Sequence, residues 1–449
     1  MADGLKASRL AVWSWILYDF ANTIFSISIL SFFFPLWVDE QIGNGGWLVN
    51  GAVAVAALLV LFTAPVLGAM ADLRQRRIPY LVVLTLISVL VTAGMDISGS
   101  IVVGVALFVA ADLTYQSALV FYNALLPAVA AGRGDGRISG YGTAAGYVGS
   151  IFALLFLTVF VEQAEAVRSL LGPLGGWIET GEENSSNAFL PTAVLYLLFS
   201  LPVFLFVPDP AVRAPRPVSL GAAYRDVLRT LKNLRRYAGL GTFILATILY
   251  TDAANTAIAN MALYGRQVFG MDNAEIRNLL LFSTVFAVVG STICGFATDS
   301  IGPKKTLLAV LGLWLVSIAL AAAALGPWML YLAGPLVGIA LGGTWTVSRV
   351  MLIALSPPEK LNEFFGLFSL AGRFSAVTGP ALTAFLLFTL DGLGALAYRI
   401  SIASLALIMG LGILFLLRVP DVRPGQRNME PGITGENPTE KSGAVDTSA

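Results

Sequence analysis

Long apolar segments follow one another along most of this chain, separated by short polar stretches. A helix that crosses the hydrocarbon core of a bilayer needs about 20 mostly apolar residues. The pattern therefore predicts an all-α membrane protein with twelve transmembrane helices. They are expected at 11–37, 47–71, 78–97, 100–127, 139–161, 189–207, 239–262, 277–298, 304–324, 327–354, 363–389 and 395–418.

Two parts of the chain break this rhythm and divide it into four regions. The stretch 208–238 separates 1–207 from 239–419, and 420–449 is a polar tail rich in Pro, Gly, Glu, Thr and Ser. Within 208–238, apolar residues recur at helical spacing beside Arg and Lys, which predicts a basic amphipathic helix on the inner membrane surface. A solvated linker helix is the alternative. The tail has the composition of a disordered segment.

Composition agrees with a membrane protein and excludes several other classes. Hydrophobic residues make up 57% of the chain, charged residues make up 12%, and the formal net charge of +0 leaves no footprint for nucleic acid. Because His is absent and Cys294 is the single cysteine, we expect no metal, no cofactor and no internal disulfide. Most Lys and Arg residues fall in loops on one side of the predicted membrane, which places both termini in the cytoplasm.

Motifs in the first half of the chain return in the second half in the same order. The pairs are D-x-A-N-T from Asp19 and Asp252, G-x-x-x-D ending at Asp72 and Asp299, and G-x-x-x-x-x-G from Gly140 and Gly366. The two members of each pair are separated by nearly the same number of residues and lie on helices of the same rank. Six helices are therefore repeated in parallel. Two such halves around a central cavity are typical of a transporter.

These motifs resemble those of the major facilitator superfamily. Its loop signature between helices 2 and 3 is similar to Gly68–Arg77, and Gly295–Lys305 matches it better because Gly302 stands where the first copy has Gln75. The chain also resembles the vacuole-effluxer-like family, related to the autophagy-linked amino-acid effluxer of yeast vacuoles. This second resemblance rests on YDFANTIF at 18–25, FYNALLP at 121–127, GRISGYGTAAGYVG at 136–149, SRVMLIALSP at 348–357 and NEFFGLFSLAGRFSAVTGP at 362–380. Both resemblances imply two six-helix bundles that move a solute by alternating access.

Each copy of D-x-A-N-T sets an acid, an amide and a hydroxyl on one helix face. The two faces are Asp19, Asn22 and Thr23 in the first half and Asp252, Asn255 and Thr256 in the second. A charged side chain deep in a bilayer costs about 2.5–3.5 kcal/mol, so these groups must face a cavity or a partner. We expect them to line one cavity from opposite sides, where they bind polar solute groups or carry a proton. The alternative is a structural clamp, in which each Asp pairs with an Arg or caps a broken helix.

The predicted helix 100–127 carries a second set of polar residues. Asp112 and Gln116 lie one turn apart, and Tyr115 lies beside them. They form either another part of the cavity lining or hydrogen bonds between helices. Asn123 lies near the inner end of the helix, before Pro127, and a structural role is favoured there.

Two arginines lie within predicted helices of the second half. Arg349 stands one turn after Trp345, and its guanidinium needs an anion, either Asp112 or a carboxylate of the solute. The alternative for Arg349 is snorkelling to the inner membrane surface. For Arg373 a partner on another helix is favoured over snorkelling because its path to the surface is longer.

The two loop signatures also have a mechanical interpretation. Their glycines allow helices to approach, and their aspartates can meet the positive N-terminus of a neighbouring helix. The basic residues that follow pair with acids or hold the membrane surface. The superfamily resemblance implies that these loops latch one conformation of the transport cycle. The latch residues are then Gly68, Asp72, Arg76, Arg77, Gly295, Asp299, Lys304 and Lys305.

The sequence favours transport over catalysis. No Walker loop, zinc-binding His-E-x-x-His or nucleophile elbow occurs, so we expect neither an enzyme nor an ATP-driven pump. We expect a secondary-active transporter of small polar solutes; the family resemblance implies amino acids, by export or exchange. Protons are a candidate coupling ion, with Asp19, Asp112 and Asp252 as candidate carriers. The alternatives are efflux of amphipathic or drug-like compounds and a transport-inactive receptor or scaffold.

The short loops and compact length favour a bacterial cytoplasmic membrane, and a vacuolar membrane is the alternative. We expect a monomer that has the lipid bilayer and a small-molecule solute as its partners. No nucleic-acid partner is expected.

Overall fold

A computed structural model describes residues 8–43, 45–95, 100–181, 184–209, 220–232, 237 and 239–421. At 220, 231, 273, 370–371, 373–378, 380 and 391 it describes the backbone alone. Across these ranges the regular elements are helices and no strand occurs. Most of the predicted tail 420–449 and much of the linker 208–238 lie outside the described residues. A helix lies at each of the twelve predicted positions. Ten described helices are long and apolar enough to cross a membrane, and α4, Ile78–Ala93, is shorter.

The first half begins with a long helix in three parts, α1, a π-helical segment and α2. Its elements are α1 Arg9–Phe25, the π-helix Ser26–Phe32, α2 Phe33–Ile42, α3 Gly46–Arg74, α4 Ile78–Ala93, α5 Ile101–Ala130, α6 Asp135–Glu162, the short α7 Ala164–Leu171 and α8 Phe189–Phe206. The π-helix starts directly after the D-x-A-N-T face. Segments of this kind are rare and are frequently found at functional sites.

The second half contains six long helices, and a shorter one precedes it. The elements are α9 Leu220–Lys232, α10 Leu240–Phe269, α11 Asn273–Ile301, α12 Pro303–Ala322, α13 Pro327–Leu355, α14 Leu361–Thr389 and α15 Ala395–Leu417. Local signals explain several starts. Proline stands in the first turn of α4, α12 and α13, where its missing N–H is not needed. Asp272 and Glu275 form a capping box that starts α11.

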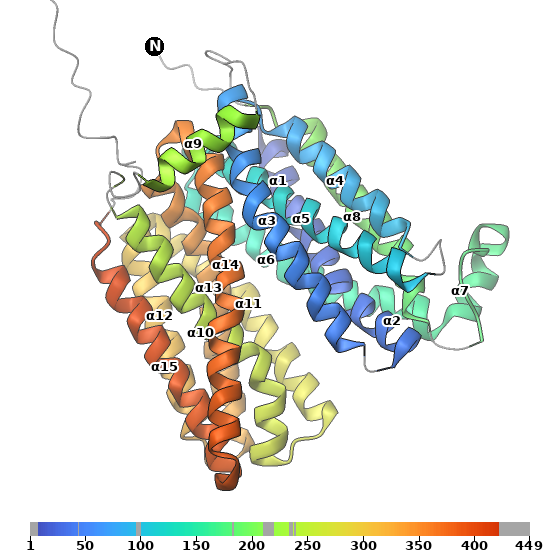
Figure 1. The fold of residues 1–449 in the computed structure, drawn as a ribbon, viewed down its shortest axis with the longest axis vertical. Helices are drawn as coiled ribbons and strands as arrows, with labels where there is room; N and C mark the ends of the chain where they lie inside the picture. The colour runs from blue at the N-terminus through green and yellow to red at the C-terminus, as the bar shows by residue number, and fades with distance from the viewer. Residues whose placement is uncertain are drawn as a thin grey trace, which may run out of the picture.

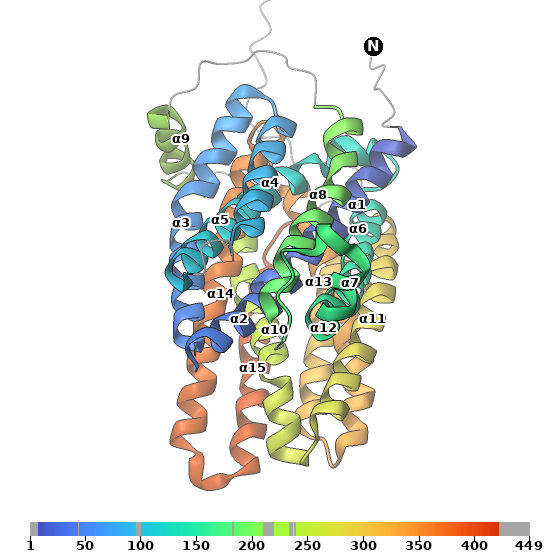
Figure 2. The same ribbon diagram turned by 90° about the vertical axis from the view of Figure 1, so that its right-hand side faces the viewer.

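The two halves stand side by side and separate toward one end (Figure 1). The helix α9 lies at the opposite end, where it packs on the end of α3, and α1 begins at the same end on the other side of the molecule (Figures 1 and 2). We call this the α9 end and the other the far end. Contacts between the halves are made mainly by α6 with α11 and α13, and by α14 with α3 and α5.

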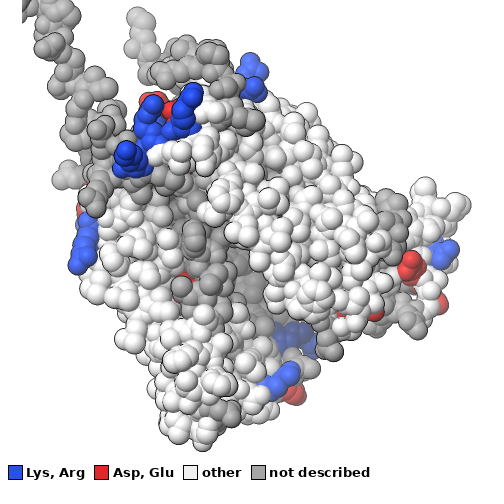
Figure 3. Space-filling model, in the orientation of Figure 1, with Lys and Arg blue, Asp and Glu red and all other residues white. Residues whose placement is uncertain are grey.

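The outer surface of the bundle is apolar, as a lipid environment requires. Large hydrophobic side chains such as Leu58, Phe62, Leu90 and Leu407 are more than half exposed. In the view of Figure 3, Lys, Arg, Asp and Glu lie mainly at the two ends of the molecule, and the surface between them is white. The same view shows a hollow between the halves that widens toward the far end.

Candidate functional site

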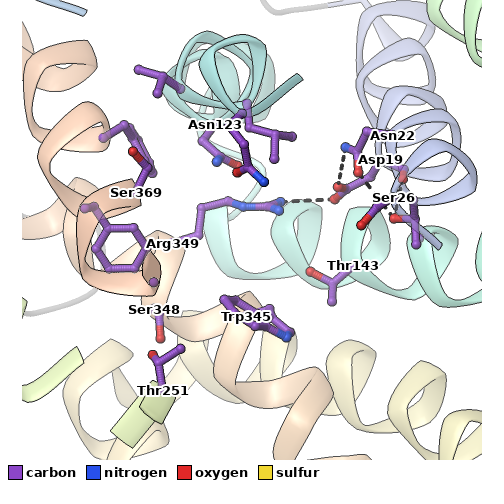
Figure 4. A pocket seen from close by; sticks show the side chains of 18 of the residues that line it. Asp19, Asn22, Ser26, Asn123, Thr143, Thr251, Trp345, Ser348, Arg349 and Ser369 are labelled. Atoms are coloured by element: carbon purple, nitrogen blue, oxygen red, sulfur yellow. Dashed lines mark hydrogen bonds and ion pairs between the residues drawn. The ribbon is translucent and has the colours of Figure 1, made fainter. Parts of the chain in front are cut away.

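A cavity of about 540 Å³ lies between the two halves. Three helices from each half form its wall, namely α1, α5 and α6 and, across from them, α10, α13 and α14. The cavity brings together most of the residues that the sequence nominated for solute or proton binding (Figure 4). Those that line it are Asp19, Asn22, Thr23, Tyr115, Gln116, Asn255, Trp345 and Arg349.

An ion pair joins the two halves in the cavity wall. Arg349 on α13 donates from Nη1 to Oδ2 of Asp19 on α1 at 3.2 Å, and their side chains are 12% and 8% exposed. Figure 4 shows the arginine extended across the cavity toward this carboxylate. Two of the alternatives for Arg349 are therefore wrong: its partner is not Asp112, and the side chain does not snorkel to the surface.

Two aromatic rings hold the guanidinium of Arg349. Its carbon lies 5.2 Å from the ring centre of Trp15 and 5.5 Å from that of Tyr122, within the range of a cation–π interaction. Trp15 and Tyr122 stack with centres 4.5 Å apart, and the indole N–H of Trp15 donates to the carbonyl of Tyr122. Neither ring was predicted to contact Arg349, although Trp15 stands one turn before Asp19 and shares its helix face.

The rest of the D-x-A-N-T face in α1 supports the same carboxylate. Asn22 donates from Nδ2 to Oδ1 of Asp19 at 3.1 Å, so each carboxylate oxygen accepts one bond. Thr23 donates to the backbone carbonyl of Asp19 at 2.8 Å. Gly142 and Gly146 of α6 lie against these side chains, because a Cβ at either glycine would lie under 3 Å from Asp19 or Thr23.

The polar residues of α5 divide between the cavity and the protein interior. Gln116 and Tyr115 line the cavity, whereas Asp112 is 1% exposed behind them and accepts a hydrogen bond from Nε2 of Gln116 at 3.1 Å. Asn123, for which a structural role was favoured, also lines the cavity. Its Oδ1 is buried and accepts no hydrogen bond from the described residues. Trp345 is 39% exposed at the opposite wall.

The second D-x-A-N-T copy is placed differently from the first. Asn255 lines the cavity, but Asp252 and Thr256 are each 1% exposed and lie outside its wall. Asp252 accepts the backbone N–H of Gly379 on α14 at 2.8 Å. The two carboxylates therefore do not face each other across the cavity as the repeat had suggested. The side chain of Arg373 lies outside the described residues.

Asp72 joins the halves at the α9 end. Its carboxylate accepts the backbone N–H groups of Asn362 and Glu363 at 3.3 and 2.8 Å, and these are N–H groups of the first turn of α14. A carboxylate at this position meets unpaired donors and the positive end of the helix dipole. Gly68, one turn earlier, allows the approach because a Cβ there would collide with the carbonyl of Asn362.

Asp299 makes the equivalent contact in the opposite direction. It accepts the backbone N–H groups of Gly136 and Arg137 in the first turn of α6, at 2.8 and 3.0 Å, and also Nε of Arg137 at 3.0 Å. A Cβ on Gly295 would lie 2.6 Å from the carbonyl of Gly136. Both motif copies thus bind the start of a helix in the other half.

The basic residues of the two loops do not all act alike. Arg77 donates to the carbonyl of Ala124 in α5, and Lys304 donates to carbonyls at the end of α15, so each holds its loop within its own half. Arg76 and Lys305 are exposed. Asp209, which sequence analysis missed, accepts the N–H groups of Arg77 and Ile78 and caps the start of α4.

Two six-helix halves around a polar cavity, joined at one end, define a transporter of the major facilitator type. Solved structures of this class have the same fold. The fucose:proton symporter of E. coli matches with a TM-score of 0.68 at 15% identity, over 92% of this chain and 98% of its own. The human organic anion transporter MFSD10 matches with a TM-score of 0.64 at 14% identity, over 93% and 100%. These matches show that the chain has this fold.

The chain belongs to the vacuole effluxer Atg22-like family, whose sequence model matches residues 48–430. The uncharacterized MFS-type transporter YxiO of Bacillus subtilis is 25% identical over 91% of this chain and 94% of its own length. Autophagy-related protein 22 of Yarrowia lipolytica is 25% identical over 66% of this chain and 52% of its own. The protein is therefore a multi-pass membrane transporter with Atg22-like effluxer relatives.

Proposed function

We propose that this protein exports or exchanges small zwitterionic solutes, amino acids foremost, by alternating access. The observation that carries the proposal is the ion pair between Asp19 and Arg349 in the cavity wall. A guanidinium binds a carboxylate, and a carboxylate binds an ammonium group. A zwitterion can therefore replace each partner of this pair, with its carboxylate on Arg349 and its ammonium on Asp19.

The exchange of partners connects binding to the transport cycle. Asp19 belongs to the first half and Arg349 to the second, so their bond must break or rearrange when the halves rock apart at this level. A buried charge left without a partner is costly. A zwitterion supplies both charges with new partners, whereas an empty cavity does not. This asymmetry favours movement of the loaded carrier and hence exchange.

The proposal extends to the gate, to coupling and to the membrane. Asp72 and Asp299 act as latches of the conformation closed at the α9 end, which the basic loops assign to the cytoplasm.

Among the described lining residues Asp19 is the one carboxylate, so a coupling proton would act there. The bacterial relatives support a bacterial cytoplasmic membrane, with a vacuolar membrane as the alternative.

A second candidate function is efflux of amphipathic compounds. The observation in its favour is the aromatic share of the cavity wall, to which Tyr115, Tyr147, Trp345, Phe365 and Phe368 contribute. Such rings bind flat apolar groups and organic cations. A substrate of that kind would need no carboxylate, and Arg349 would then remain paired with Asp19 during transport.

Counterflow of radiolabelled amino acids in proteoliposomes tests the proposal. We expect saturable exchange in the wild type and a loss of tenfold or more in Asp19→Asn, about 1.4 kcal/mol of lost binding. Asp39→Asn is the control, because Asp39 lies outside the cavity and an amide oxygen can still accept the N–H of Gly45. Exchange that survives in Asp19→Asn would contradict the proposal. No exchange of any amino acid by folded protein would favour amphipathic efflux.

A further inference from the structure

The helix α9 packs on the first half through one side. Ala223 and Val227 are buried against Val66, Ala69 and Met70 of α3. Val66 and Met70 follow at four-residue steps from Phe62, which is 62% exposed on the lipid-facing side of α3. The helix α9 thus lies at the point where the lipid-facing stripe of α3 reaches the end of the membrane.

The same helix is bonded to the second half. Thr230 is 1% exposed, and its hydroxyl accepts a hydrogen bond from Nζ of Lys360 at 2.6 Å. Lys360 also lies 3.3 Å from the carboxylate of Glu363, whose backbone N–H binds Asp72. In Figure 1, α9 lies across the top of the molecule between α3 and the second half. It therefore joins both halves beside the Asp72 contact.

The remaining surface of α9 has two adjacent zones. Tyr224 and Leu228 are 50% and 49% exposed, one turn apart on the side next to the α3 contact. Arg225, Arg229 and Lys232 are exposed on the following side, where Arg229 also pairs with Asp226 at 3.3 Å. Figure 3 shows this basic group as a blue cluster at the α9 end. An apolar zone bordered by basic residues is the arrangement of a helix at a membrane interface.

We propose that this surface of α9 binds anionic phospholipid headgroups and that the bound lipid stabilises the conformation closed at the α9 end. Basic residues at a membrane surface attract anionic lipids, and the apolar zone next to them continues the lipid-facing side of α3. In the closed conformation α9 contacts both halves at once, α3 through Ala223 and Val227 and the second half through Thr230. A ligand that holds α9 in place therefore favours that conformation, and the closed conformation binds the ligand more tightly. The proposal holds whatever the solute is.

The test measures the closed population of the full-length protein in nanodiscs. The lipid is phosphatidylcholine alone or phosphatidylcholine mixed with phosphatidylglycerol. Spin labels at Arg74→Cys and Arg418→Cys, both exposed at the α9 end, report the distance between the halves in a Cys294→Ala background. We expect phosphatidylglycerol to raise the ratio of closed to open protein by about fivefold or more. No change in this ratio would overturn the proposal.

Two variants separate lipid binding from the connection between the halves. The variant with Arg225→Gln, Arg229→Gln and Lys232→Gln is expected to lose the response to phosphatidylglycerol, and an unchanged response would refute the lipid site. Thr230→Val retains the basic side but removes the acceptor for Lys360. This variant should still copurify with phosphatidylglycerol, but phosphatidylglycerol should no longer raise its ratio of closed to open protein. A rise as large as in the wild type would refute the proposal that α9 connects the two halves. The control Arg277→Gln removes an exposed charge at the far end and should respond like the wild type.

Discussion

At the residue scale, Asp19 and Arg349 hold opposite charges on side chains that are largely buried, 8% and 12% exposed. Removing one partner of a buried ion pair leaves the other charge unpaired and costs about 3–5 kcal/mol. We therefore expect Asp19→Asn and Arg349→Gln each to lower the Tm of the detergent-purified protein. The double variant should regain most of that loss, because no unpaired charge remains.

Tryptophan fluorescence during thermal unfolding measures all four proteins, and the comparison forms a double-mutant cycle. Losses that simply add in the double variant would mean that each charge is stabilised by groups other than its partner. The zwitterion mechanism would then lose its structural basis, since it needs a pair whose members depend on each other.

At this scale the sequence predicts which residues belong to the site but not which partners they contact. An Asp or Arg inside an apolar segment is conspicuous, and Asp19 and Arg349 were both nominated from that alone. Their contact joins positions 330 residues apart, which depends on how the halves dock. The symmetry argument also failed for Asp252, because one carboxylate faces a cavity and the other a backbone N–H. A repeated motif conserves the helix face but not its surroundings.

At the scale of elements, the contact of α3 with α14 requires a glycine at position 68. A Cβ on Gly68 would collide with the carbonyl of Asn362 across the interface. We expect Gly68→Ala to shift the equilibrium toward the conformation open at the α9 end by about tenfold, a population change of 1.4 kcal/mol. The distance between spin labels at Arg74→Cys and Arg418→Cys measures this shift.

Gly312→Ala in α12 is the matched control for that variant. No neighbouring atom lies within 4 Å of a Cβ placed there, so the substitution causes no collision. It favours the helix by about 1 kcal/mol, as Gly68→Ala does, because alanine has the higher helix propensity. It should leave the closed population unchanged. If both variants behave alike, the effect of Gly68→Ala comes from the helix itself and not from the interface.

Elements could be predicted well because hydrophobic length is a strong local signal. A helix lies at each of the twelve expected positions. The π-helix Ser26–Phe32 was not foreseen, since its backbone depends on packing between helices. The repeated glycine motif does not predict which glycines pack at equivalent places either. Gly146 packs on Thr23, but the glycine that packs on Thr256 is Gly379, and nothing lies within 4 Å of a Cβ on Gly372.

At the scale of the whole molecule, the two ends differ: the halves are joined at the α9 end and apart at the far end. The hydrogen bonds and ion pairs that join the described parts of the two halves involve Asp19, Asp72, Asp299 and Ser139, all toward the α9 end of their helices. The halves separate toward the far end. A sequence repeat predicts two similar halves, but it does not predict which of their two ends is closed.

Accessibility of the cavity tests whether the α9 end is the closed one. Ser369 lines the cavity on α14, and Ser300 is exposed near the end of α11 at the α9 end. In a Cys294→Ala background, we expect Ser369→Cys to react with a membrane-impermeant thiol reagent at least about tenfold faster from the far side than from the α9 side, because a minor conformation holds about 10% of the population or less. Ser300→Cys should show the reverse preference, which establishes the orientation in vesicles. Equal labelling rates at Ser369→Cys from both sides would mean that the conformation open at the α9 end is populated as much as the conformation open at the far end. The latches at Asp72 and Asp299 would then contribute no bias between the two conformations.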